Sequence, residues 1–348
     1  RRVDAHRDDT ARWLATIGGI VSPSGQERER AEAVANQMRR IGLSDVTVDA
    51  SPNVTGRIRG RSGQALVFVS TLDDLATVAA HQRATTTKPR LDGNRVIGPG
   101  TNTSTTTAAL VAAAEALIAS GFQPEHDLVF AAVAQEETGL VGMKALYEQW
   151  RDRAIAFVDV LGDGHSVTYG AITIHWWKVV ASGPGGHSLN GGVPNVNQGI
   201  GRAVDRILSL PHPERYQADR VVINVAMLQS GAVYNHKPET GWFSLDVRSL
   251  DGARVDEVEA EVKKVLAGVT AETAIAFDLQ PFQITPGGQI PGLRDSALVT
   301  TAQAISAYLG YPAQLGNAGS ANLNVPLGRG SVAIGIGGER GGRRGFSD

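Results

Sequence analysis

Three almost uninterrupted apolar runs constrain the fold of this chain of 348 residues more than any other feature. The runs cover residues 65–70, 128–134 and 154–158. A strand exposed on one face alternates apolar and polar residues, so a continuous apolar run predicts a strand buried on both faces. Patterns with helical spacing occupy residues 8–19, 26–42 and 108–118. We therefore expect an α/β domain whose helices cover both faces of a sheet.

Shorter signals add detail to the first part of this domain. Residues 46–48 and 54–58 have the composition of short strands. Ser24 and Glu27 lie three residues apart at the start of the helix expected at 26–42. A serine followed by a glutamate at this spacing predicts a capping box, in which each side chain bonds to a free backbone N–H of the first helical turn.

The pattern changes near residue 171. Residues 172–181 alternate as in a half-exposed strand. Helical patterns at 195–209 and 253–267 then accompany strand patterns at 221–228, 242–248 and 273–279. After Pro286, a helix at 295–309 and a buried strand at 331–336 restore the first pattern. We expect a compact α+β domain of the ferredoxin-like type at 172–283, inserted into an α/β domain formed by 1–171 and 284–348.

The composition is ordinary for a soluble globular protein. The net charge of −2 gives no indication of a nucleic-acid partner, and no apolar run approaches the length of a membrane span. The chain has no cysteine, which excludes disulfides and thiolate metal ligands. A cytoplasmic location and secretion after removal of a segment ahead of Arg1 both remain open.

Four segments follow one another at characteristic spacing across nearly the whole chain. They are Gly98–Gly100 before an Ala-rich helix, Val133–Gly139 with its Glu-Glu pair, Ser182–Ser188 with a Gly-rich turn and a His, and Gly231–Asn235 leading to Asp246–Arg248. Together they resemble the dizinc metallopeptidase family that includes glutamate carboxypeptidase, peptidase T and aminoacylase. The resemblance implies a three-layer zinc-peptidase-like catalytic domain, an inserted domain that serves as a lid and dimerises, and a homodimer.

The resemblance also implies roles for individual residues. In the family, two zinc ions share a bridging carboxylate and a water, and a nearby Glu takes the proton of that water. Glu136 matches this general acid/base and Glu137 matches a zinc ligand. His187 matches a His that reaches the active site of the neighbouring subunit. Asn235 and Arg248 match residues that hold a substrate carboxylate or the backbone near it, a task that suits the fork of an arginine.

The chain departs from the family at most of the zinc ligands. The position of the first His ligand holds Thr71, although Asp73, which orients that ligand, is present. The bridging carboxylate should fall at Thr103, and residues 101–107 contain no carboxylate. Asp159 matches a third ligand. The last ligand should be a His in the Gly-rich segment 337–345, and no His follows residue 236.

We therefore expect no zinc pair and no other cofactor, because neutral threonine hydroxyls are poor zinc ligands. Acidic ligands without a cation would repel one another, and a threonine at the bridging position relieves that repulsion. The cleft would then be adapted to having no metal. An oxygen-only site for magnesium, calcium or manganese, built from Asp73, Glu137 and Asp159, is the alternative.

Three functions remain open from the sequence. The first is an enzyme that acts on a peptide, amide or N-acyl amino acid, by hydrolysis or another reaction, with Glu136 as general acid/base and His187 from a second subunit. The second is a non-catalytic relative that binds a peptide or small ligand in the same cleft. The third is an ordinary metallopeptidase inactivated by substitution. His175, with the two tryptophans after it, is expected to pack the inserted domain or its dimer edge.

Overall fold

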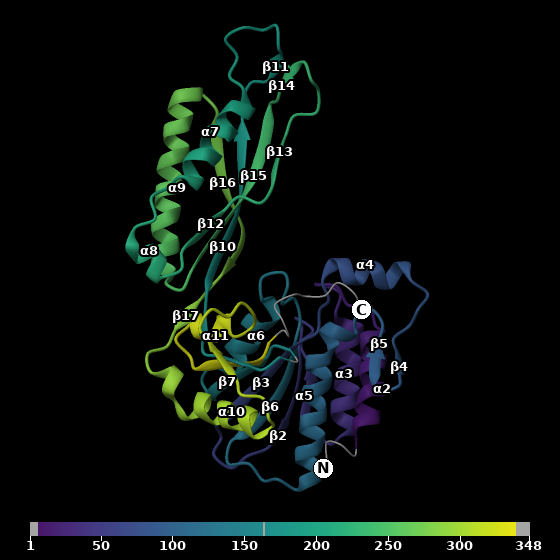
Figure 1. The fold of residues 1–348 in the computed structure, drawn as a ribbon. Helices are drawn as coiled ribbons and strands as arrows, with labels where there is room; N and C mark the ends of the chain where they lie inside the picture. The colour runs from purple at the N-terminus through teal and green to yellow at the C-terminus, as the bar shows by residue number, and fades with distance from the viewer. Residues whose placement is uncertain (1–5, 163, 339–348) are drawn as a thin grey trace. The chain divides into compact units, whose positions relative to one another are not determined.

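A computed structural model describes residues 6–162 and 164–338 and divides the chain into two compact units (Figure 1). Unit 1 consists of residues 1–171 and 289–348, and unit 2 of residues 172–288. The sequence suggested the same first boundary and put the second at 283, because it ended the last strand of the insertion at 279. That strand, β16, in fact continues to Thr285.

The main sheet of unit 1 has eight strands in the order β1-β2-β6-β3-β7-β19-β8-β18. Their bounds are β1 (Ser44–Val48), β2 (Val54–Ile58), β3 (Ala65–Thr71), β6 (Asp127–Val133), β7 (Ala154–Val160), β8 (Ser166–Thr168), β18 (Gln314–Gly316) and β19 (Ala333–Gly337). The central strand β3 pairs in parallel with both β6 and β7. The carboxyl ends of these three strands therefore meet at one edge of the sheet, where α/β proteins commonly place their sites.

Helices cover both faces of this sheet, which confirms the predicted α/β class. They are α2 (Arg7–Gly18), α3 (Arg28–Arg40), α4 (Ala76–Ala84), α5 (Thr101–Ser120), α6 (Val141–Trp150), α10 (Ala297–Tyr308) and α11 (Asn324–Gly328). In β6, Phe130 and Ala132 share a core with α2, α3 and α5. The alternate residues Val129 and Ala131 share a core with α6 and α10. This alternation of side chains along a buried strand produces three layers.

Unit 2 is an antiparallel sheet with two long helices on one face. Strand β10 (Thr173–Ser182) lies between β15 (Thr240–Ser249) and β16 (Ala276–Thr285). Trp177, Val179 and Ala181 of β10 pack beneath α7 (Val196–Leu208) and α9 (Gly252–Thr273). The strand expected at 221–228 is two short strands, β12 (Val222–Asn224) and β13 (Leu228–Ser230), both paired with β15. Short strands β11 (Gly186–His187) and β14 (His236–Lys237) pair with each other.

Two local predictions were wrong. The capping box does not form, because α3 begins at Arg28 and the hydroxyl of Ser24 donates instead to Asp73 Oδ2 at 2.6 Å. The Ala-rich helix begins at Thr101 rather than at residue 108, so the Thr-rich stretch is helical. Two further helices, α4 and α6, were not predicted, although the buried residues of α6 recur at helical spacing. No helix in the described ranges is both long and apolar enough to cross a bilayer.

Candidate functional site

The turn that follows β6 carries Glu136 and Glu137, and Asp73 holds it in place. Asp73 lies just beyond β3, next to β6 in the sheet. Its Oδ1 accepts the backbone N–H of Glu136 at 2.9 Å, and its Oδ2 accepts that of Glu137 at 3.1 Å. Gln135 has a φ of 55°, a left-handed conformation that costs free energy in a residue other than glycine. The bonds to Asp73 help to hold this strained turn.

Glu27 supports the same turn from the other side. Its Oε1 accepts the backbone N–H of Gly25 at 2.7 Å and that of Gln135 at 3.1 Å. The side chain is buried, and its Oε2 has no hydrogen-bond partner among the described residues. Burial, together with the nearby charge of Asp73, raises the pKa of Glu27. Only a capping role was predicted for Glu27, because nothing local to it indicates a contact more than 100 residues away.

A buried ion pair lies at the start of α5. Asp74 and Arg30 are both almost fully buried, and the guanidinium donates to both carboxylate oxygens, at 3.0 and 2.5 Å. Arg30 also donates to the carbonyl oxygen of Leu72 at 2.8 Å. The hydroxyl of Thr103, in the first turn of α5, donates to Asp74 Oδ1. The side chain at the expected bridging position is therefore bonded to a carboxylate that already has a cation.

Asp159, near the end of β7, is also buried and bonded to the protein. Its Oδ2 accepts the backbone N–H of Leu323 at 2.9 Å. The side-chain amide of Asn322 donates to Thr71 Oγ1 at 3.2 Å and lies 3.5 Å from Asp159 Oδ1. Burial raises the pKa of Asp159 to about 7, and the bonds from Leu323 and Asn322 only partly offset this. Near neutral pH this carboxyl group is thus partly protonated.

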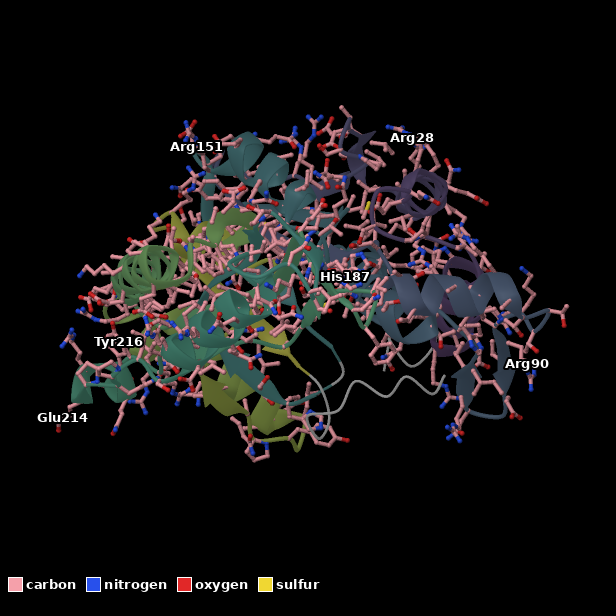
Figure 2. The ribbon with its side chains drawn as sticks, turned by 90° about the horizontal axis from the view of Figure 1, so that it is seen from above. Arg28, Arg90, Arg151, His187, Glu214 and Tyr216 are labelled. Carbon is pink, nitrogen blue, oxygen red and sulfur yellow. The ribbon has the colours of Figure 1, made fainter. Side chains whose placement is uncertain are left out.

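In unit 2, His187 and Asn235 lie together. The ring of His187, labelled in Figure 2, lies on β11 with its Nε2 3.1 Å from the side-chain amide of Asn235. The backbone N–H of Leu189 donates to Nδ1 of the same ring at 3.2 Å. The side chain of Asn235 also contacts Nδ1 of His236 at 2.9 Å. The imidazole is thus oriented through both of its nitrogens.

Arg248 lies on β15 of the five-stranded sheet, whereas His187 belongs to the separate pair β11 and β14. Arg248 pairs with Ile174 in the register of β10 and β15, whereas the end nearest His187 is marked by the pair Ser182 and Thr240. Eight residues of strand separate these positions, which corresponds to about 26 Å. The guanidinium of Arg248 donates to the carboxylate of Asp246 at 2.9 Å and lies over the ring of Trp176 at 5.7 Å.

Comparison with known proteins identifies the family. Residues 74–334 match the model of peptidase family M20/M25/M40. The chain belongs to this family. The predicted recognition is thereby confirmed, and the match begins one residue after Asp73, so it does not include Thr71. No curated protein matches the chain by sequence.

Solved structures of M20-like peptidases share the fold. A tripeptidase from Staphylococcus aureus is similar with a TM-score of 0.79 and 17% identity, over 95% of this chain and 90% of that chain. Aminopeptidase PepT from Bacillus cereus gives a TM-score of 0.78 and 17% identity over the same shares. Human carnosine dipeptidase 1 gives 0.68 and 14%, over 96% of this chain and 90% of that chain. At such identities the likeness establishes the fold alone.

Within this M20 fold, the predicted residues of unit 1 gather at or near one edge of the sheet. They are Thr71, Asp73, Thr103, Glu136, Glu137 and Asp159. Asp73, Glu137 and Asp159 do not form a group with the spacing of metal ligands, so the oxygen-only alternative lacks support from the described side chains. Residues 339–345 of the Gly-rich segment lie outside the described residues. Glu27, Arg30 and Asn322 were missed because their roles depend on contacts distant in sequence.

Proposed function

We propose that this M20-family chain is an enzyme that acts on a peptide, amide or N-acyl amino acid without the zinc pair of its family, with Glu136 as general acid/base. One observation carries the proposal. Protein partners already bond the side chains at three of the expected ligand positions, Thr71, Thr103 and Asp159. The turn that presents Glu136 is held by Asp73 and Glu27. The site thus supports a positioned carboxylate better than it supports a pair of cations.

The side chains at the expected ligand positions are a poor donor set for a zinc pair. A zinc ion takes four nitrogen, sulfur or oxygen ligands, and its protein ligands must be free to turn toward it. Thr103 donates to Asp74, which is neutralised by Arg30. Thr71 and Asp159 are bridged by the amide of Asn322. These residues do not fit a zinc pair, and no catalytic step is assigned to one.

The proposed chemistry uses proton transfer by groups of the chain itself. Glu136 takes a proton from the attacking water or from the substrate and returns it to the leaving nitrogen. Asp159 belongs to β7, on the other side of β3 from β6, so the ends of the two strands lie roughly 10 Å apart. With a pKa of about 7, Asp159 offers a neutral acid near physiological pH as a second proton donor.

The proposal includes a homodimer. His187 and Asn235 lie at one end of the sheet of unit 2, and Arg248 lies at the other. One copy of unit 2 therefore cannot bring all three side chains to one small substrate. In a two-fold dimer, His187 of the partner subunit can approach a site that contains the chain's own Arg248. A monomer by light scattering at micromolar concentration would count against this arrangement.

The test is turnover by Glu136→Gln on a panel of dipeptides and N-acyl amino acids, before and after dialysis against a chelator. We expect the substitution to lower kcat by about 10²–10⁴-fold, because a general acid/base contributes that much. Glu148→Gln, which neutralises an exposed carboxylate on α6, is the matched control and should keep full turnover. Unchanged turnover in Glu136→Gln would remove the assigned base, and loss of activity on chelation would restore a role for metal.

The alternative is a non-catalytic relative that binds a peptide or small ligand. The first turn of α5 contains no acidic residue, and Thr103, at the expected bridging position, is bonded to Asp74. The absence of a carboxylate that could activate a water at this position favours the non-catalytic alternative. Absence of turnover by both the wild-type chain and Glu136→Gln, together with binding of a panel member by calorimetry, would select this alternative.

A further inference from the structure

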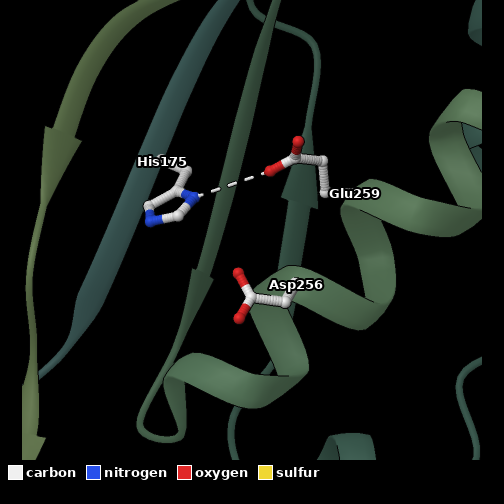
Figure 3. Close-up of side chains that lie close together, drawn as sticks. All are labelled: His175, Asp256 and Glu259. Atoms are coloured by element: carbon white, nitrogen blue, oxygen red, sulfur yellow. Dashed lines mark ion pairs between the residues drawn. The ribbon is translucent and has the colours of Figure 1, made fainter.

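Unit 2 contains a cluster of metal-ligating side chains that the proposed function does not use. His175 of β10 faces Asp256 and Glu259 of α9 (Figure 3). One ligand atom from each residue lies within 4.8 Å of the other two. Within the described ranges, this is the only group of three or more His, Cys, Asp or Glu side chains with that spacing. The expected packing role of His175 therefore describes it incompletely.

Regular secondary structure brings the three residues together. In β10, His175 shares the helix-covered face with Trp177 and Val179, because alternate residues of a strand point to the same side. In α9, Asp256 and Glu259 are three residues apart and so lie on one face of the helix. The helix start is secured by Asp251, whose side chain accepts the backbone N–H of Ala253 at 2.9 Å. The cluster is thus held by a strand and a capped helix, not by loops.

The histidine has an unmet bonding requirement. Its Nδ1 is buried and has no hydrogen-bond partner among the described residues. The atom lies 4.0 Å from Glu259 Oε2, which is too long for a hydrogen bond. Burial lowers the pKa of His175 and thereby favours the neutral ring, the form that binds metals. Buried polar atoms normally have a bonding partner. The unpaired Nδ1 therefore indicates that a partner belongs between the ring and the two carboxylates.

We propose that His175, Asp256 and Glu259 bind one divalent transition cation of the zinc class. One imidazole and two carboxylates supply three protein ligands, and water completes a four-coordinate shell. Two carboxylates balance the charge of the ion. Lys263 Nζ forms an ion pair with Glu259 Oε1 at 2.7 Å, which leaves Oε2, the oxygen that faces His175, for the metal. The ion would fasten α9 to β10 and stabilise the insertion.

The experiment measures zinc uptake by the full chain after removal of metal with a chelator. Equilibrium dialysis against zinc chloride gives the zinc bound per chain for wild type, Asp256→Asn and Glu259→Gln. The matched control is Glu261→Gln, an exposed carboxylate of α9 that pairs with Lys264. We expect wild type and Glu261→Gln to bind one equivalent of zinc. Each cluster variant should bind zinc about 100-fold more weakly, because losing even a residue that only orients a metal ligand can weaken binding by that factor. Added zinc should raise the Tm of wild type and of Glu261→Gln, and it should leave the Tm of the two cluster variants unchanged.

Asp256 is exposed, so Asp256→Asn should fold normally and keep the test valid even where Glu259→Gln does not. Equal uptake by all four proteins, or no uptake by wild type at micromolar zinc, would overturn the proposal. Uptake of three equivalents by wild type but only two by Asp256→Asn would instead contradict the zinc-free cleft and leave this site intact. The two proposals can therefore fail separately. Cobalt substitution offers a second readout, because a four-coordinate site of this kind should give a visible absorption band that Asp256→Asn abolishes.

Discussion

Acidic side chains gather in two regions of the chain, and the regions differ in what already holds them. At the sheet edge of unit 1, Asp73, Asp74 and Asp159 accept hydrogen bonds from backbone amides, a buried arginine and an asparagine. In unit 2, Asp256 and Glu259 face a histidine whose buried nitrogen has no hydrogen-bond partner among the described residues. The comparison teaches that the donors around a carboxylate, more than the number of carboxylates, decide whether a cation fits.

Arg30 already neutralises a buried carboxylate of the first region. Its guanidinium is a permanent cation with several donors in a fixed plane, and it satisfies Asp74 and nearby carbonyls at once. A bound ion would have to displace these bonds and leave a buried arginine unpaired, which is costly. In unit 2, Lys263 pairs with Oε1 of Glu259, whereas Oε2 is the oxygen that faces His175.

The largest effect is expected from Arg30→Met, which tests whether the first region depends on its internal cation. An unpaired Asp74 would remain in the core, so the free energy of unfolding should fall by about 3–5 kcal/mol in urea denaturation. The double variant Arg30→Met/Asp74→Leu should recover much of this loss. Arg39→Met, on the exposed side of α3, should stay within about 0.5 kcal/mol of wild type. A mild effect of Arg30→Met would show that the pair is dispensable.

The raised pKa of Asp159 predicts that the free energy of unfolding depends on pH in a definite direction. Its pKa is about 7 in the folded chain and near 3.8 when unfolded, so between these values the folded state holds the extra proton. Stability therefore falls as pH rises through this window, by up to about 4 kcal/mol, and levels off above pH 7. Asp159→Asn should remove that slope in denaturation curves at pH 5 and pH 8. The exposed Asp152→Asn should retain it, and a slope unchanged in Asp159→Asn would refute the assignment.

A smaller effect is expected from Asp73→Asn, which tests the support of the turn that carries Glu136. The amide can replace only one of the two carboxylate oxygens that accept backbone N–H groups, so stability should fall by about 2 kcal/mol. Turnover should fall with it, because the base loses its fixed position. Denaturation and activity assays on the same samples check both results. Asp92→Asn, which is exposed on β4 (Arg90–Asp92), should change neither.

The smallest effect is expected from Thr103→Val, which preserves shape and removes the hydroxyl that bonds Asp74. Loss of this bond should cost about 1–2 kcal/mol in the free energy of unfolding, because its acceptor is a buried charge. Thr105→Val removes a hydroxyl that bonds only the carbonyl oxygen of Thr101 in the same helix, so it should cost less. Equal losses of stability in the two variants would show that the bond from Thr103 to Asp74 contributes no more than the bond from Thr105 within the helix.

Much of the fold could be predicted because strong periodic patterns are local. The apolar runs at 65–70, 128–134 and 154–158 correspond to β3, β6 and β7, and the change near residue 171 coincides with the start of unit 2. Helix α6 was not predicted, although Met143, Leu146 and Trp150 recur at helical spacing and pack in the core of unit 1. A helix this short is stabilised mainly by the tertiary packing of its apolar face.

The sequence by itself determined the family motifs and the layered α/β plan, and it predicted the loss of a histidine at Thr71 and of a carboxylate at Thr103. Only the tertiary structure decided which groups bond to the side chains at these positions. Arg30 meets Asp74 across 44 residues and Asn322 meets Asp159 across 163, and no local pattern reports such pairs. The same holds for His175 and Glu259, since a strand and a distant helix become neighbours only when the chain folds around its apolar core.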